Sequence, residues 1–183
     1  YLNLNYKISN SNEDLEESTH IILPGVGSYG ASIEKIKNKI DINFLKKQII
    51  SEKKFFLGIC VGMQVLSTKG YEFSESDGLN LIPGKVSKLN TSDLPSIHIG
   101  WNEINIVNTN CQLTEGLTNK STFYFVHGYK YELENKNNLV SNTEYNESFP
   151  SIIQLKNIYG VQFHPEKSQQ SGLKLLSNFS NLK

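Results

Sequence analysis

The chain has 183 residues with 18 basic and 18 acidic side chains, so its formal net charge at pH 7 is zero. A neutral chain of this size gives no electrostatic reason to expect binding to nucleic acid or a membrane, and its length fits one domain, 1–183, with a substantial core. All 18 basic residues are lysines, which excludes an arginine clamp for phosphate or carboxylate. With two cysteines, no visible signal peptide and no apolar run of the roughly 18 residues that a membrane helix needs, we expect a reduced, cytoplasmic protein.

The first half of the chain alternates strand and helix patterns, which predicts an α/β fold with a central mixed, mostly parallel sheet flanked by helices. The chain begins at Tyr1, without Met, and at once enters a strand-like segment, as if cut within an element. We expect strands over 6–8, 20–23 and 55–59, an acidic helix over 13–17, amphipathic helices over 31–39 and 42–53, and a helix over 61–68.

The second half is rich in short strand patterns separated by Asn, Gly and Pro. The gaps between them are too short for helical crossovers, so several of these strands should be antiparallel. The expected strands are 85–89, 102–107, 122–126, 139–142, 152–155 and 158–163, with a polar surface loop over 132–138 and a closing amphipathic helix over 171–182.

Cys60 lies at a predicted turn from strand into helix, in the sequence FFLGICVGMQVL. Gly58 and Gly62 allow the backbone to turn sharply and present the thiol above the edge of the sheet. The N-terminus of the following helix favours the thiolate form. A cysteine in an apolar run is usually a small core residue, but a core strand has no need of two glycines around a thiol. The pattern therefore favours a nucleophile.

His164 ends another predicted strand and begins the sequence His-Pro-Glu. Ends of strands are the usual place for catalytic groups in open α/β sheets. Pro165 fixes the intervening backbone, so Glu166 can turn back toward the imidazole. Taken singly, the histidine would be a core or surface residue and the glutamate a surface charge. Together with Cys60 they predict a Cys-His-Glu enzyme of acyl transfer.

A second glycine-rich turn, PGVG at 24–27, follows the predicted strand 20–23. Its backbone N–H groups would form half of an oxyanion hole, and the N–H group of Val61 the other half. A plain glycine-rich loop or a phosphate cradle is the alternative. His20, His98 and His127 are interpreted as structural and Cys111 as a bystander. The histidines and cysteines show no metal-ligand spacing, so we expect neither a metal nor a cofactor.

Seven sequence segments together resemble one family, the class I (triad) glutamine amidotransferases, and within it the glutaminase subunits of imidazole glycerol phosphate synthase. They are LPGVGSYG, LGICVGMQ, GLNLIPG, IHIGWN, FYFVHGY, GVQFHPEKS and GLKLLSNF, and they cover nearly the whole chain in the family's order. The resemblance implies the family's fold and a role for each matching residue. These roles are Cys60 as nucleophile, His164 as acid and base and Glu166 as its orienting carboxylate; Gly25, Val26, Gly27 and Val61 at the oxyanion; Gln64, Glu72, Gly128 and Tyr129 around the substrate; and Tyr124 and Lys167 facing a partner.

The chain departs from the family in three places. The family usually has Leu at the position of Val61 and Ser or Thr at the position of Gly128. It also begins with a strand ending in a D-Y-G-x-G-N-like motif, followed by a helix, and both are missing from this sequence. Because that strand is central in the family's sheet, its loss would expose an unpaired edge, so we interpret the sequence as incomplete at its start.

The resemblance implies hydrolysis of L-glutamine to glutamate and ammonia. The ammonia would pass to a cyclase subunit, in a heterodimer that forms imidazole glycerol phosphate and AICAR for histidine biosynthesis. A paralogous subunit that supplies ammonia for acetamidino-sugar synthesis would have the same chemistry. A catalytically inactive binding or regulatory module is the alternative of a different class, and the three intact triad residues argue against it.

Overall fold

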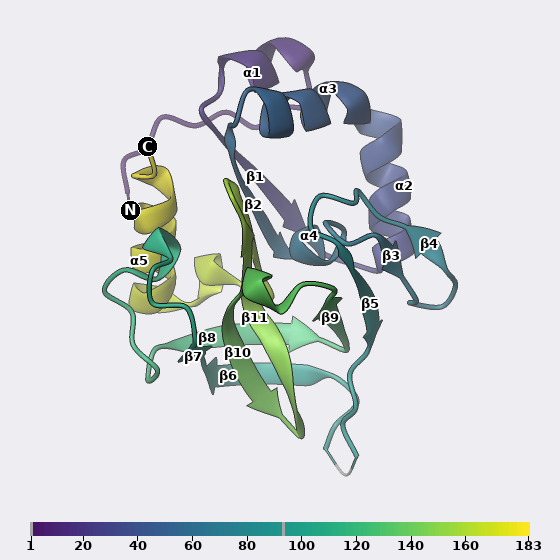
Figure 1. Ribbon diagram of the computed structural model, residues 1–183, viewed down its shortest axis with the longest axis vertical. Helices are drawn as coiled ribbons and strands as arrows, with labels where there is room; N and C mark the ends of the chain where they lie inside the picture. The colour runs from purple at the N-terminus through teal and green to yellow at the C-terminus, as the bar shows by residue number, and fades with distance from the viewer. Residues whose placement is uncertain (1, 93) are drawn as a thin grey trace.

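The computed structural model describes residues 2–92 and 94–183, so Tyr1, the first residue of the expected domain, lies outside them. Its central feature is a six-stranded sheet with the strand order β1–β2–β12–β11–β10–β7 (Figure 1). The strands are β1 (His20–Gly25), β2 (Phe55–Cys60), β12 (Ile158–Val161), β11 (Glu147–Leu155), β10 (Leu139–Tyr145) and β7 (Asn105–Ile106).

Parallel pairing is confined to one side of this sheet. β2 pairs in parallel with β1 and with β12, and Gly25 is the register partner of Cys60 where β1 and β2 end. β11, β10 and β7 continue the sheet with antiparallel pairing. Tight turns at Asn146, between β10 and β11, and at Lys156, between β11 and β12, both at positive φ, leave room only for hairpins there. The sheet is mixed, as expected, but its parallel part is limited to three strands.

Two smaller sheets lie beside the central one. One has the order β4–β3–β5–β9, and the other consists of β6 and β8. β8 and β9 are joined through Gly128 alone, so the chain passes from one small sheet directly into the other. The strands are β3 (Lys69–Gly70), β4 (Ser76–Asp77), β5 (Gly84–Lys88), β6 (His98–Glu103), β8 (Thr122–His127) and β9 (Tyr129–Leu133).

The helices surround the central sheet (Figure 1). Ser11 and Asp41 cap the first and third of them, because their side-chain oxygens accept backbone N–H groups of the first turn. The α-helices are α1 (Asn12–Glu17), α2 (Tyr29–Lys39), α3 (Ile42–Lys46), α4 (Val61–Gln64) and α5 (Gln169–Ser180), and shorter turns are the π-helical Lys47–Ser51 and the 3-10 turns Gln112–Thr114, Lys136–Asn138 and Pro165–Lys167.

α4 and α5 cover opposite faces of the sheet at β12. The Tyr159 ring meets Phe179 of α5 edge-on, with the ring centroids 6.3 Å apart. A Cβ atom on the next residue, Gly160, would lie 2.7 Å from Cγ of Met63 in α4. Because successive side chains of a strand point to opposite faces, the two helices lie on different sides, and the carboxyl end of β2 is enclosed between layers.

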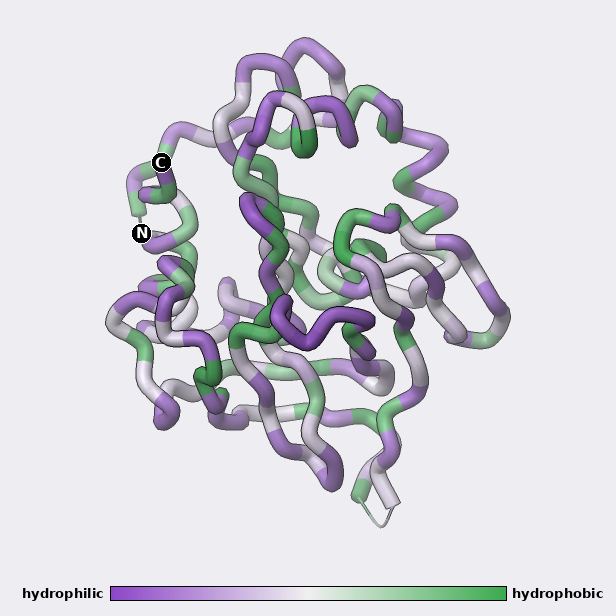
Figure 2. Tube along the Cα trace, in the orientation of Figure 1, coloured by the Kyte–Doolittle hydropathy of each residue, from purple (hydrophilic) through white to green (hydrophobic). Residues whose placement is uncertain are grey.

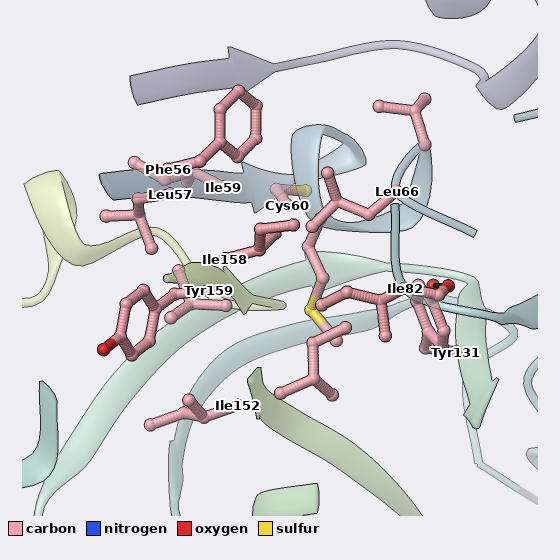
Figure 3. Packing of buried hydrophobic residues seen from close by; sticks show 14 of the residues in the cluster. Phe56, Leu57, Ile59, Cys60, Leu66, Ile82, Tyr131, Ile152, Ile158 and Tyr159 are labelled. Carbon is pink, nitrogen blue, oxygen red and sulfur yellow. Dashed lines mark hydrogen bonds between the residues drawn. The ribbon is translucent and has the colours of Figure 1, made fainter. Parts of the chain in front are cut away.

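Apolar side chains of the central strands form the core. Phe56 and Leu57 of β2 and Ile152 of β11 have no solvent exposure, and they pack in one cluster with side chains of α4 (Figure 3). Hydrophobic segments gather along these strands, whereas α1 and the outer loops are hydrophilic (Figure 2). Among the residues that the structure describes, no helix is long and apolar enough to cross a membrane.

Several element predictions were confirmed and others were wrong. Helix 13–17 and strands 20–23, 55–59 and 122–126 are present with small changes of bounds. Segment 6–8 is not a strand. Tyr6 and Ile8 are 80% and 94% exposed, and no strand within the described part of the chain pairs with the backbone of this segment.

The predicted helix 61–68 ends early. The N–H groups of Leu66 and Ser67 donate to Met63 O and Gln64 O, three residues back, at 3.1 Å each, so the chain after α4 tightens into three-residue turns instead of continuing the α-helix. Val65 O and Leu66 O then accept hydrogen bonds from the N–H groups of Leu79 and Leu81, each 2.8 Å long, which hold this segment against a later part of the chain.

Other predicted bounds were also wrong. The helix over 42–53 is α3 followed by the π-helical turn, the strand over 102–107 is replaced by the end of β6 and by β7, and the loop over 132–138 begins inside β9. β9, which pairs antiparallel with β5, was missed although its sequence YKYEL alternates apolar and polar residues, which was a usable strand signal.

Candidate active site

Cys60 occupies a strained turn between β2 and α4 (Figure 3). Its φ of 54° and ψ of −114° are unusual for a residue with a side chain. The neighbouring glycines permit the turn. A Cβ atom on Gly58 would lie 2.4 Å from Gly62 O, and one on Gly62 would lie 2.0 Å from Leu23 O. The backbone therefore holds the thiol at the carboxyl end of β2, as the sequence predicted.

Strand β8 holds both reactive residues. The Cys60 thiol donates to Val126 O at a distance of 3.8 Å, and the His164 backbone N–H group donates to Tyr124 O at 2.8 Å. Cys60 is 4% exposed and His164 is 6% exposed. Two side chains that are far apart in the sequence are thus fixed at one place by a single strand.

His164 and Glu166 form an ion pair in which His164 Nδ1 lies 2.8 Å from Glu166 Oε1. The carboxylate accepts a hydrogen bond from the Nδ1–H group, which leaves Nε2 for the reaction. Interaction with the Cys60 side chain, followed by the hydrogen bond to Glu166, raises the pKa of His164 to about 9. Burial acts to raise the pKa of Glu166, but the hydrogen bond to His164 holds it below its ordinary value.

This arrangement can activate a thiol. At neutral pH an imidazole with a raised pKa carries a proton, and a carboxylate on its far side stabilises that charge. A protonated imidazole beside a cysteine stabilises the thiolate and is ready to give a proton to a leaving group. The geometry suits nucleophilic attack on an acyl or amide carbon.

The glycine turn, residues 25–27, packs directly on this site. A Cβ atom on Gly25 would lie 2.5 Å from Gly62 N, so only glycine fits there. Gly27 has a φ of 103°, and Val26 is 83% exposed. Within the described residues, the N–H groups of Val26 and Gly27 donate to no protein acceptor. They remain available as donors to an oxyanion, together with Val61 at the start of α4.

A cavity of about 300 Å³ lies behind this turn, between β1, α2 and α4. Its lining includes Gly25, Val26 and Val61, but not Cys60 or His164. We therefore do not place a reacting group in it.

Gln64 and Tyr129, both predicted to contact substrate, are joined by a hydrogen bond. Gln64 is 3% exposed, and its Nε2 lies 3.1 Å from Tyr129 O and 3.0 Å from Gln162 Oε1. Gly128 O accepts the N–H group of Leu89 at 2.9 Å. The backbone between β8 and β9 is thus tied to the helix that follows the nucleophile.

Glu72 lies at the N-terminus of α2. Its Oε2 accepts the Tyr29 N–H group at 2.6 Å, while Ser28, the N-cap residue, makes no capping hydrogen bond with its side chain. The carboxylate therefore stabilises the start of this helix. The substrate role that the resemblance gives to Glu72 stays a prediction.

Tyr124 and Lys167, both predicted to face a partner, lie together. Lys167 Nζ is 5.7 Å from the centroid of the Tyr124 ring, a cation–π geometry. Trp101 meets the same ring edge-on at 6.0 Å and is 48% exposed. Sequence reasoning missed Trp101 as part of this surface, although the tryptophan in the segment IHIGWN was a usable signal.

His98 and His127 form a buried pair with their ring nitrogens, Nδ1 and Nε2, 3.2 Å apart. Burial lowers the pKa of His98 to about 4 and that of His127 to about 3, so both are neutral at pH 7. His127 Nδ1 lies 2.9 Å from Tyr129 O. Their geometry fits the structural reading of the sequence, and His127 also orders the backbone beside Gln64.

The remaining predicted bystander, Cys111, is buried, and burial raises the pKa of its thiol. Within 2–92 and 94–183, no group of three or more His, Cys, Asp or Glu side chains could hold a metal ion.

Sequence comparison identifies the class of protein. The profile of the family described as Glutamine amidotransferase class-I matches residues 2–181. The chain belongs to the class-I glutamine amidotransferase family.

More specific relatives follow from pairwise comparison. The chain is 40% identical over 185 residues to the imidazole glycerol phosphate synthase subunit HisH of Pelagibacter ubique, and the match covers 98% of this chain and 87% of that protein. It is 44% identical over 170 residues to the subunit of the same name from Pyrococcus furiosus, with 92% of this chain and 84% of that protein covered.

Solved structures support the fold. A crystal structure described as a glutamine amidotransferase superposes with a TM-score of 0.71 at 16% identity, covering 98% of this chain and 88% of that one. PurLQS from Thermotoga maritima superposes with a TM-score of 0.67 at 20% identity, covering 91% and 80%. At these identities the likeness shows the shared architecture alone.

Proposed function

We propose that the chain hydrolyses L-glutamine to glutamate and ammonia with Cys60 as the nucleophile. The observation that carries this proposal is the His164–Glu166 pair beside a cysteine held in a strained strand-to-helix turn. Membership of the glutamine amidotransferase family names the substrate class that such a site would take.

The proposed reaction has two halves. The Cys60 thiolate attacks the side-chain carbonyl carbon of glutamine, and the C–N bond breaks as His164 gives its proton to the departing ammonia. Water then attacks the thioester and loses a proton to His164, and glutamate leaves as the thiolate forms again. In both halves the N–H groups of the glycine turn and Val61 would stabilise the oxyanion.

Substrate binding follows from the residues around the nucleophile. Gln64 and Glu72 would hold the α-amino end of glutamine, and the backbone at Gly128 and Tyr129 would receive its carboxylate. The hydrogen bonds from Gln64 and His127 to Tyr129 O support this, because they fix the backbone at that point.

The ammonia would pass to a cyclase subunit in a heterodimer, which would form imidazole glycerol phosphate and AICAR. The names of the relatives from Pelagibacter ubique and Pyrococcus furiosus support this pathway. Tyr124 and Lys167 would lie at the subunit contact, where they already form a cation–π pair. A partner from acetamidino-sugar synthesis would use the same glutaminase site, so assays with each cyclase distinguish the two pathways.

The test replaces the nucleophile. Cys60→Ala should abolish glutamine-dependent synthesis by the complex and leave ammonia-dependent synthesis intact, because the acceptor chemistry takes place on the partner. Cys111→Ala is the matched control and should retain both activities. A diazoketone analogue of glutamine should label Cys60 and not Cys111, as mass spectrometry of the peptides would show. Glutamine hydrolysis by Cys60→Ala would refute the assignment.

A further inference from the structure

Gln162 is a buried polar side chain that sequence reasoning did not single out. It follows β12 directly, has no solvent exposure, and its backbone N–H group donates to Ser151 O at 2.9 Å. A buried amide needs partners at both ends. Gln162 Oε1 lies 3.0 Å from Gln64 Nε2, and Gln162 Nε2 lies 4.0 Å from Cys60 Sγ. The side chain therefore bridges a predicted substrate residue and the nucleophile.

The orientation of the Gln162 amide follows from its neighbours. The backbone carbonyl group of Tyr129 can only accept a hydrogen bond, so the Gln64 group 3.1 Å from it must be the NH₂ group. The same NH₂ group lies against Gln162, which must therefore present its oxygen. The NH₂ group of Gln162 is then left facing Cys60.

A buried histidine holds this network in place. His127 Nδ1 donates to the same Tyr129 carbonyl group, because a carbonyl oxygen can only accept. The imidazole is neutral, so its Nε2, which faces His98, carries no proton. If the Gln64 amide rotated, its oxygen would meet the Tyr129 oxygen, which is unfavourable in a buried site. Gln64, and Gln162 with it, are thus held in a single orientation.

We propose that Gln162 is a positioning residue for the nucleophile: its carbonyl group holds Gln64, and its N–H group holds the Cys60 sulfur. The inference rests on the proposed function, in which Cys60 reacts as a thiolate. The thiol donates to Val126 O at 3.8 Å, a contact that a thiolate cannot make favourably. Once the proton has left, the N–H groups of Gln162 and His164 are the donors that face the sulfur. A fixed neutral donor favours the charged form without reorganisation.

Three titratable groups belong to the surroundings of the Cys60 sulfur. His164 interacts with the Cys60 side chain, Glu166 is hydrogen-bonded to His164, and the charge of His164 acts on His127 of β8. His127 is neutral across the range from pH 5 to pH 10 because its pKa is about 3. Glu166 is also ionised across this range, because its pKa is held below the ordinary value. A change of reactivity with pH in this range therefore reports Cys60 together with His164.

The test measures how fast iodoacetamide alkylates Cys60 in the full chain as a function of pH, with peptide mass spectrometry to separate Cys60 from Cys111. Methionine in Gln162→Met has a similar length but no hydrogen-bond donor. We expect the pH profile of alkylation to move up by about one pH unit in this variant, which makes alkylation at pH 7 about tenfold slower. The maximal rate at high pH should stay the same. Gln48→Met is the matched control, since Gln48 is also buried but lies in the π-helical turn, and its profile should not change.

A second variant keeps the test informative if Gln162→Met fails to fold. Gln64→Met removes the donor that orients Gln162 and should shift the profile in the same direction by a smaller amount. The double variant should behave like Gln162→Met alone, because both changes act through one hydrogen bond.

Two results would overturn the inference: an unchanged profile in Gln162→Met, or alkylation slowed equally at every pH, which would indicate a purely structural role. Alkylation requires no glutamine turnover. A profile shift in a chain that shows no glutaminase activity even in complex with its cyclase and acceptor ligand would therefore refute the proposed function and leave the positioning role of Gln162 supported.

Discussion

At the scale of single residues, the site depends on placing a base beside a thiol inside the protein. His164 is buried, yet it holds a proton more tightly than a free histidine, because Cys60 and Glu166 both favour its charged form. The buried His98 and His127 show the opposite behaviour, since burial lowers the pKa of both and, among the residues that the structure describes, no carboxylate is hydrogen-bonded to either ring. The pKa of His164 therefore differs from those of His98 and His127 because of its hydrogen-bond partners and not because of its burial.

The raised pKa of His164 predicts the alkaline limit of activity. As the pH rises through about 9, His164 loses the proton that the leaving ammonia needs, so glutaminase turnover should fall. The same group stabilises the fold most fully below pH 6.5, the ordinary histidine value, and this contribution is lost as the pH rises through about 9. A pH–rate profile of glutamine hydrolysis, measured on the complex with the cyclase and its acceptor ligand, gives this alkaline limit.

Glu166→Gln should move that alkaline limit to lower pH, because it removes the second cause of the raised pKa. Turnover at neutral pH should fall less than in His164→Asn, which removes the acid and base itself. An alkaline limit that stayed in place in Glu166→Gln would contradict the role given to the carboxylate.

At the scale of elements, the site lies where the carboxyl ends of β1 and β2 meet. The glycine turn and the turn at Cys60 touch backbone to backbone, with Gly25 against Gly62. Parallel pairing of β1 with β2 brings them together, so one strand register sets the positions of the proposed oxyanion donors and the proposed nucleophile.

Gly25→Ala tests this contact. The added methyl group would lie 2.5 Å from Gly62 N, so backbone must shift. We expect a loss of about 1–3 kcal/mol in the free energy of unfolding, typical of overpacking, and a fall in turnover of about a hundredfold or more if an oxyanion donor is displaced. Gly30→Ala is the control, since a methyl group there meets only the Ser76 side chain, at 3.2 Å. Urea unfolding and a glutaminase assay measure both effects, and equal behaviour of the two variants would argue against the contact.

At the scale of the whole molecule, β8 contributes both to the candidate active site and to the surface formed by Trp101, Tyr124 and Lys167. Tyr124 O binds the backbone of His164 while the Tyr124 ring faces Lys167 and Trp101. A partner that contacts Tyr124 would therefore contact the strand to which both Cys60 and His164 are hydrogen-bonded.

We expect the chain alone to be nearly inactive and its cognate cyclase with acceptor ligand to raise turnover by on the order of a hundredfold, the contribution of one recruited oxyanion donor. Glycine at positions 25 and 27 would let the peptide N–H groups of the turn reorient with little backbone strain. Lys167→Ala should reduce this activation more than it changes the KM for glutamine. Steady-state assays with and without the cyclase decide, and full turnover by the isolated chain would refute the expectation.

The sequence by itself determined the local chemistry of the site. Glycines around Cys60, the proline between His164 and Glu166, and the glycine turn constrain the backbone over a few residues, so their conformations can be read from residue types and from the resemblance of the segments. Only the tertiary structure decided the partner of Glu72, the pairing of β9 and the orientation of Gln162. Each of these depends on hydrogen bonds between residues far apart in the chain, and no local pattern specifies which distant group completes a buried donor or acceptor.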